Sequence, residues 1–175
     1  MIELTRFEYC PRCGAAAIEC RDPKAMRCKA CDFVYYHNTA SAVAAIIEMD
    51  GGFLLTVRAQ EPKAGFYDCP GGFVDHGESI EDALMREIRE ELGIDVVISA
   101  FMASFPNRYV FRDVVYFTTD AFFICRPAKS SAEIIASDEI RQWEIIRPDR
   151  IPFEKLAFES NVKALSRYRD LCASR

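Results

Sequence analysis

The sequence predicts a mixed α/β domain that follows a small cysteine-rich module at the N-terminus. Residues 1–36 contain five of the eight cysteines and too few apolar side chains to form a core of their own. From Ala40 onward, short apolar runs alternate with turn residues, as in a β-sheet, while residues 79–92 repeat apolar side chains at helical spacing. Half of the 175 residues are apolar, so a packed core is expected. We assign residues 1–36 to the module and residues 37–175 to the α/β domain.

The N-terminal module carries two Cys-x-x-Cys pairs, Cys10 with Cys13 and Cys28 with Cys31. Each pair places two thiolates on one side of a tight turn, and four thiolates satisfy tetrahedral Zn²⁺ with no coordination position left open. The spacing therefore predicts a structural zinc ribbon, and the alternative is four unrelated buried cysteines. We interpret Cys20, between the pairs, as a spare thiol.

The α/β domain is expected to open with a hairpin. Strands at Ser41–Glu48 and Phe53–Arg58 are joined by Asp50-Gly51-Gly52, where glycine permits a positive φ. Shorter strands are predicted at Phe66–Cys69 and Phe73–Val74, on either side of a second glycine turn.

A helix is predicted from Ser79, a good N-cap residue, to the residue before Gly93. On a helical wheel, Glu87, Glu90 and Glu91 border the buried stripe instead of opposing it. Several carboxylates close together at a buried edge repel one another, and a hard cation such as Mg²⁺ relieves that repulsion. Metal ions also neutralise the charge of a pyrophosphate linkage and favour attack by water. These acids therefore indicate a metal site for phosphate chemistry.

Three further strands are expected at about Val96–Ser104, Val114–Cys125 and Gln142–Ile146. The C-terminal residues 158–172 have an apolar stripe at helical spacing, which predicts a second helix.

The stretch from Gly72 to Ile94 resembles the Nudix box: Gly, five residues, Glu, seven residues, then Arg-Glu-apolar-x-Glu-Glu-x-Gly-apolar. The matching positions are Gly72, Glu78, Arg86, Glu87, Ile88, Glu90, Glu91, Gly93 and Ile94. The resemblance implies the Nudix α/β/α sandwich with a mixed sheet for residues 37–175.

The resemblance also implies a metal-binding set. Glu87, Glu90 and Glu91 are the expected ligands of Mg²⁺ or Mn²⁺, with the backbone carbonyl of Gly71 as a further ligand. Arg86 is expected to orient Glu87.

Other residues of the box are given supporting roles by the same resemblance. Glu78 is expected to brace the loop onto the helix, and Gly72 and Gly93 are expected to be structural. In some family members the general base lies in a later loop, where Glu139 is the candidate. The alternatives are Glu87 as the base and an ordinary exposed acid at Glu139.

A cysteine ribbon directly before a Nudix domain resembles the NADH pyrophosphatases. A further motif of those enzymes survives only in fragments in residues 103–109. We therefore expect hydrolysis of a nucleoside diphosphate linked to another group, such as ADP-ribose, an ADP-sugar or a dinucleotide, with release of a mononucleotide. One alternative is activity on NADH, NAD or NAD-capped RNA. The other is a non-catalytic ribbon that binds nucleic acid or protein.

Three residues outside the box are candidate substrate contacts. Arg58 is expected to contact phosphate, although an ordinary surface arginine is the alternative. Tyr109 and Phe111 are expected to stack on a base, and ordinary strand packing is the alternative.

Composition narrows the function classes. A net charge of -5 gives no general attraction to nucleic acid or to anionic membranes, so nucleic acid is kept only as a secondary partner. No apolar run approaches the ~20 residues of a membrane span, and residues 1–9 contain no signal-peptide core, so a cytoplasmic location is expected. A homodimer is implied only by analogy with the NADH pyrophosphatases.

Overall fold

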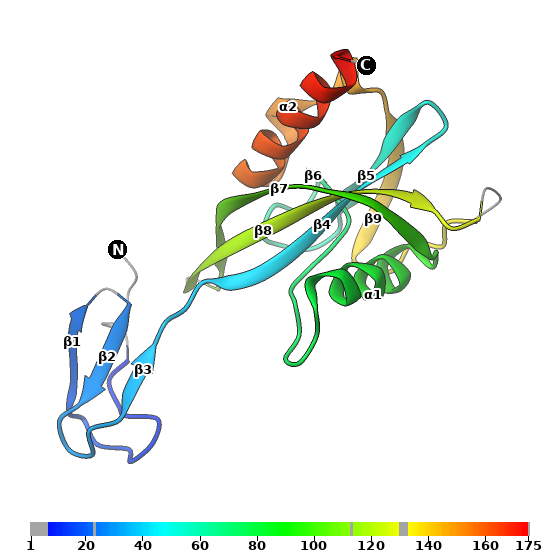
Figure 1. Cartoon of the computed structure of the whole chain (residues 1–175). Helices are drawn as coiled ribbons and strands as arrows, with labels where there is room; N and C mark the ends of the chain where they lie inside the picture. The colour runs from blue at the N-terminus through cyan, green and yellow to red at the C-terminus, as the bar shows by residue number, and fades with distance from the viewer. Residues whose placement is uncertain (1–6, 23, 113, 130–132, 175) are drawn as a thin grey trace.

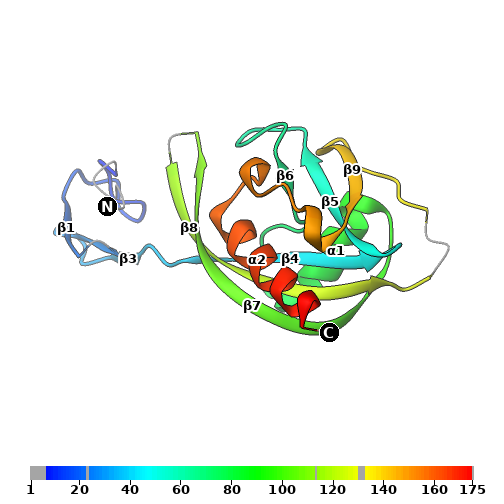
Figure 2. The same ribbon diagram turned by 90° about the horizontal axis from the view of Figure 1, so that it is seen from above.

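The computed structural model describes residues 7–22, 24–112, 114–129 and 133–174. These residues form a small three-stranded sheet, a six-stranded sheet and two α-helices. Figures 1 and 2 show the small sheet standing apart from the larger domain, joined to it by the segment that follows Tyr36. Residues 1–6 of the predicted ribbon lie outside the described residues.

The small sheet is antiparallel and has the order β1-β2-β3, with β1 at Ile18–Asp22, β2 at Ala25–Cys28 and β3 at Val34–Tyr36. Both cysteine pairs sit in tight turns at its end. The Gly14 N–H donates to the Cys10 carbonyl at 2.8 Å, and the Asp32 N–H donates to the Cys28 carbonyl at 3.0 Å. The two turns therefore direct the thiols of one cysteine pair toward those of the other pair.

The larger sheet has the order β6-β5-β4-β8-β7, and β9 pairs with β5. Its strands are β4 (Ala40–Met49), β5 (Gly52–Arg58), β6 (Tyr67–Asp68), β7 (Val96–Phe111), β8 (Val114–Pro127) and β9 (Ile140–Ile146). Strands β4 and β8 are parallel and the other pairs are antiparallel, so the sheet is mixed as predicted. In the β4–β5 turn, Asp50 and Gly51 both have positive φ (51° and 76°), which a tight hairpin of this twist requires.

The two helices cover opposite faces of this sheet (Figure 1). Helix α1 spans Ile80–Leu92 and α2 spans Glu159–Ala173. Successive residues of β4 alternate between the faces: Ala45 and Ile47 pack with α1, whereas Ala44 and Ile46 pack with α2. The sheet is therefore buried on both sides, which confirms the predicted α/β/α sandwich. Short 3₁₀ turns at Pro148–Arg150 and Phe153–Lys155 lead from β9 to α2.

Helix α1 begins and ends at the predicted residues. The Ser79 side chain accepts a hydrogen bond from the Asp82 N–H at 3.1 Å. At the other end, Gly93 adopts φ 68° and its N–H donates to the Arg89 carbonyl at 3.0 Å. The described residues contain no helix of the length and apolarity that a bilayer span requires.

Two predicted strands differ from the structure. Strand β7 continues seven residues beyond Ser104 to Phe111 and pairs with β8 throughout that extension. It passes through Pro106, which is tolerated because β7 is an edge strand and needs no donor on its outer side. The strand expected at Phe73–Val74 is reduced to a single bridge between Phe73 and Ala42.

Candidate active site

The four cysteine sulfurs of the small sheet converge. All lie within 4.8 Å of one another, with 3.8 Å between Cys10 and Cys31 and 3.7 Å between Cys13 and Cys28. Sulfur atoms about 2.3 Å from a tetrahedral Zn²⁺ lie about 3.8 Å from one another, so this cluster fits the ion. In the part of the chain that the structure describes, no other three metal-ligating side chains come as close together. Cys20 is exposed and is not in the cluster.

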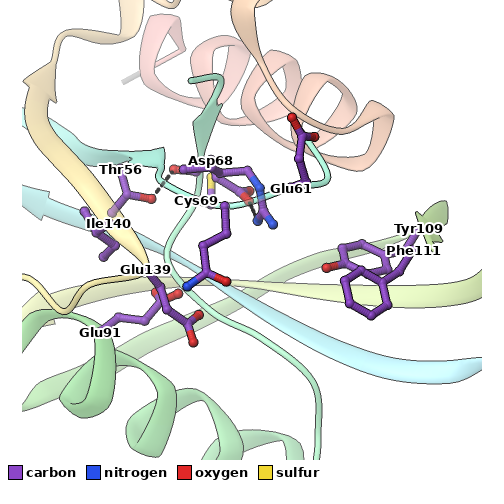
Figure 3. Close-up of a pocket in the computed structure, with 11 residues that line it drawn as sticks. Thr56, Glu61, Asp68, Cys69, Glu91, Tyr109, Phe111, Glu139 and Ile140 are labelled. Carbon is purple, nitrogen blue, oxygen red and sulfur yellow. Dashed lines mark hydrogen bonds and ion pairs between the residues drawn. The ribbon is translucent and has the colours of Figure 1, made fainter. Parts of the chain in front are cut away.

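The predicted metal ligands Glu87, Glu90 and Glu91 lie at two adjoining pockets of about 240 and 380 Å³. Both pockets are lined by residues of β5, β6, α1, β7 and the segment before β9. The residues common to both are Arg58, Asp68, Cys69, Glu91, Tyr109 and Glu139. Figure 3 shows Glu91 and Glu139 close together on one side of the smaller pocket, with the rings of Tyr109 and Phe111 on the other.

The glycine turn between β6 and α1 lets the loop approach both β4 and the helix. A Cβ on Gly71 would lie 2.9 Å from the Ala44 Cα, and φ at Gly71 is 146°. A Cβ on Gly72 would lie 2.5 Å from the Glu87 carboxyl carbon. Glycine is therefore needed at Gly71 for the backbone and at Gly72 for the position of the Glu87 carboxylate.

Arg86 links the acids of the box. It donates two hydrogen bonds to Glu78, at 2.9 and 3.0 Å, and one each to Glu87 (2.9 Å) and Glu90 (3.0 Å). These bonds from Arg86 lower the pKa of Glu78. Glu78 also accepts from the Asp75 N–H at 3.1 Å, so one carboxylate joins the loop to the helix. This geometry suits the bracing and orienting roles predicted for Glu78 and Arg86, which stay predictions.

Burial favours the protonated form of two acidic residues of helix α1. It raises the pKa of Glu87, whose side chain is 16% exposed, and raises the pKa of Glu91 to about 8. The nearby charge of Glu139 acts in the same direction on both, while the Gly71 N–H, 3.0 Å from the Glu91 carboxylate, opposes it. Glu90 is 60% exposed at the rim. The carboxylates do not converge as the cysteines do, but oxygen ligands facing one pocket suit Mg²⁺, which keeps several waters.

The predicted substrate contacts all line these pockets. Arg58 is already engaged by the protein, because it donates to Asp68 at 2.7 Å and to the Pro62 carbonyl at 2.8 Å. Tyr109 packs against Phe73 and Phe158, with ring centroids 5.5 and 5.7 Å apart. Phe111 is 40% exposed. Roles for Arg58, Tyr109 and Phe111 in binding substrate stay predictions.

Several polar residues of the pocket walls were not anticipated from the sequence. Asp68, Thr118, Asp120 and Asn161 line the larger pocket, and burial raises the pKa of Asp68. Asn161 donates to Asp68 at 2.6 Å. The signal in the sequence was Asp120, an acidic residue directly before the apolar run at residues 121–125 of strand β8.

Comparisons with known proteins agree with this geometry. A family model described as NUDIX domain matches residues 37–168. The ADP-ribose pyrophosphatase of Methanocaldococcus jannaschii is 34% identical over 128 residues, which cover 71% of this chain and 70% of that protein. The NAD-capped RNA hydrolase NudC of Photobacterium profundum is 32% identical over 114 residues, but these cover only 42% of that protein and 64% of this chain.

A solved structure shows the same fold. The NUDIX hydrolase from Nitrosomonas europaea superposes with a TM-score of 0.77 and covers 95% of this chain and 93% of its own, at 23% identity. The matched domain, the acid-lined pocket and the relatives lead to one conclusion: the chain belongs to the Nudix hydrolases, enzymes that act on pyrophosphate bonds.

Proposed function

We propose that the protein is a Mg²⁺- or Mn²⁺-dependent pyrophosphohydrolase that cleaves a nucleoside diphosphate linked to a second group and releases a mononucleotide. The preferred class is that of ADP-ribose and ADP-sugars. The proposal rests mainly on one observation: the acids of α1 and the aromatic side chains around Tyr109 line a single pocket of about 380 Å³. A diphosphate can lie at the acids while its base reaches the rings. The similarity to the ADP-ribose pyrophosphatase of Methanocaldococcus jannaschii supports the same class.

The proposed metal ligands are Glu87, Glu90, Glu91 and the Gly71 carbonyl. The carbonyls of Pro70 and Gly72 on either side accept hydrogen bonds from β4, at 2.8 and 2.9 Å, and Gly71 is left out of these pairs. A bound metal ion would neutralise the diphosphate charge and favour ionisation of the attacking water. Arg86 holds two of the carboxylates from one side, which keeps them in place before substrate arrives.

Two residues compete for the role of general base. Glu87 accepts a hydrogen bond from the Arg86 guanidinium at 2.9 Å, and this cation makes the carboxylate a weaker base. No described side chain donates to the Glu139 carboxylate, which lines both pockets beside Glu91. A carboxylate without a cation bound to it is the better proton acceptor, so we favour Glu139. In the step, a water oxygen bonds to one phosphorus as the bridging P–O bond breaks, and Glu139 receives the proton.

The function is tested with purified protein, Mg²⁺ and a substrate panel: ADP-ribose, NADH, NAD, FAD, ADP-sugars and diadenosine polyphosphates. Mononucleotide release is followed by chromatography. The proposal expects release that is lost without Mg²⁺ and in Glu87→Gln. Release that persists in both controls, or no release from any substrate with Mg²⁺ or Mn²⁺, would refute it.

The same assay separates the two bases. If Glu139 is the base, Glu139→Gln should lower kcat by roughly 10²–10⁴-fold, in line with general-base catalysis, with little change in Mg²⁺ affinity. Glu87→Gln should lower both kcat and Mg²⁺ affinity. If the Glu139→Gln enzyme kept the wild-type kcat, Glu139 would not be the general base, and Glu87 would be the remaining candidate.

We also propose that the cysteine cluster holds a structural Zn²⁺ and that NAD-type dinucleotides are the second candidate substrates. The similarity to an NAD-capped RNA hydrolase supports the latter, over less than half of that relative's length. Preferred hydrolysis of NAD or NAD-capped RNA over ADP-ribose would establish it.

A further inference from the structure

The larger pocket has a polar recess that none of the proposed catalytic roles uses. It is formed by Thr118 and Asp120 of β8 and Asn161 of α2. All three residues line the pocket, yet all three are buried: Thr118 is 3% exposed, Asp120 8% and Asn161 2%. Burying a carboxylate and an amide at a pocket wall is costly unless they are hydrogen-bonded, so the partners of each atom decide what the recess can bind.

The recess offers acceptors to a ligand. Asp120 accepts from the Thr118 hydroxyl at 2.5 Å and from the Ser160 hydroxyl at 2.6 Å, one on each carboxylate oxygen. Each oxygen can take a second hydrogen bond, and both hydroxyl protons are already used. Asn161 donates one of its two amide N–H groups to Asp68 at 2.6 Å, and no described residue donates to its carbonyl oxygen. The Asp120 carboxylate and the Asn161 carbonyl oxygen therefore both offer lone pairs to a ligand, which suits an N–H donor.

An aromatic wall adjoins these acceptors. Tyr109 and Phe158 line the same pocket, with ring centroids 5.7 Å apart. A ring placed between two others needs about 7 Å, twice the usual contact distance, so a ligand ring cannot enter between them. A planar ligand would instead lie against the wall, with one edge toward Asp120 and Asn161. Contact between the face of a flat heterocycle and this wall fixes the plane of the heterocycle and leaves its edge free for hydrogen bonding.

We propose that this recess holds the base of the nucleotide and selects a base with an exocyclic amino group, adenine in the case of ADP-ribose. This inference rests on the proposed function, because it names the base half of that substrate. The amino group donates to Asp120 and to the Asn161 carbonyl oxygen. A base with a carbonyl oxygen at the same position brings that acceptor against the Asp120 carboxylate, which weakens its binding.

The test compares ADP-ribose with IDP-ribose, in which hypoxanthine carries an oxygen in place of the adenine amino group. Loss of a hydrogen bond to a charged group predicts a preference of roughly 10- to 100-fold in kcat/KM for ADP-ribose. In Asp120→Asn, the new amide can donate to a carbonyl oxygen, so the preference should fall by about 10-fold or more, mainly through KM. Equal use of both substrates by the wild type, or an unchanged preference in Asp120→Asn, would overturn the inference.

Ser160→Ala is the matched control. It removes the hydrogen bond that ties Asp120 to α2, but Ser160 does not line the pocket. We expect lower thermal stability and an unchanged substrate preference. If Ser160→Ala shifts the preference as much as Asp120→Asn does, Asp120 acts only by holding α2, and the inference fails.

Product binding separates this inference from the hydrolase proposal. Calorimetry should show that AMP binds the wild type more tightly than IMP, by a factor that shrinks in Asp120→Asn. Tighter AMP binding without turnover of any substrate would keep the base site and refute the hydrolase. Turnover of ADP-ribose with equal affinity for AMP and IMP would refute only the base site.

Discussion

Replacing Gly72 with alanine tests whether the position of the Glu87 carboxylate, apart from its chemistry, is needed for turnover. The added Cβ would lie 2.5 Å from the Glu87 carboxyl carbon and 2.7 Å from one of its oxygens. Normal contact between such atoms is about 3.5 Å, so the carboxyl group must retreat by about 1 Å. A displacement of this size in a catalytic group can cost about 10²-fold in rate. We therefore expect kcat of Gly72→Ala to fall by about 100-fold.

The fold should survive this substitution. Gly72 does not have a positive φ, and the atoms in the way are the end of a flexible side chain. Gly71→Ala is the contrasting variant, because its Cβ would press on the backbone of Val43 and Ala44 at a φ of 146°. We expect Gly72→Ala to keep a melting temperature within a few degrees of the wild type, and Gly71→Ala to lose stability by about 1–3 kcal/mol or more.

The assay is release of AMP from ADP-ribose with saturating Mg²⁺, together with thermal unfolding. A double-mutant cycle then assigns the cause: if Gly72→Ala acts through Glu87, it should have little further effect on a Glu87→Gln enzyme. Wild-type kcat in a folded Gly72→Ala protein would refute the reasoning. So would a 100-fold loss that persists unchanged in the Glu87→Gln background.

Three further predictions concern pH, zinc and the aromatic wall. Because burial raises the pKa of Glu91 from 4.5 to about 8, protonated Glu91 contributes stability that is fully present below pH 4.5 in zinc-loaded protein without Mg²⁺, and about 4 kcal/mol of that contribution should be lost as the pH rises to 8. The increase in melting temperature on adding Mg²⁺ should therefore grow over that range, and it should grow less in Glu91→Gln; a pH-independent increase in the wild type would count against Glu91 as a ligand. Cys28→Ser should remove the zinc found by elemental analysis and open residues 10–31 to proteolysis, because metal binding supplies roughly 10–16 kcal/mol to such a module; a zinc-free ribbon that stays protease-resistant would contradict this. Tyr109→Ala should raise KM for ADP-ribose about 5- to 100-fold through lost stacking, whereas Tyr109→Phe keeps the ring and should change it little; an unchanged KM in Tyr109→Ala would remove Tyr109 from the substrate site.

Much of the fold could be predicted because its signals are local. Ser79 and Gly93 delimit α1 through caps that depend only on neighbouring residues, and both caps are present. The apolar run within residues 41–48, followed by a glycine turn, predicted a strand, and its successive residues pack on opposite faces of the sheet. The prediction was wrong where local sequence and tertiary pairing disagreed. The fragment around Pro106 has no clear strand pattern, yet pairing with β8 carries β7 through it to Phe111.

Within the sites, the sequence by itself determined two sets of ligands: the glutamates on one short helical segment and the cysteines in two similar turns. The spacing of Glu87, Glu90 and Glu91 places them near one another on any helix, and two Cys-x-x-Cys turns bring four sulfurs together once the turns meet. Tertiary structure alone decided which distant residues join them. Glu139 comes from the turn before β9, Tyr109 from β7, and the Asp120–Asn161 recess from β8 and α2. Their meeting depends on strand order and on the packing of α2, which are long-range contacts that no local period or spacing encodes.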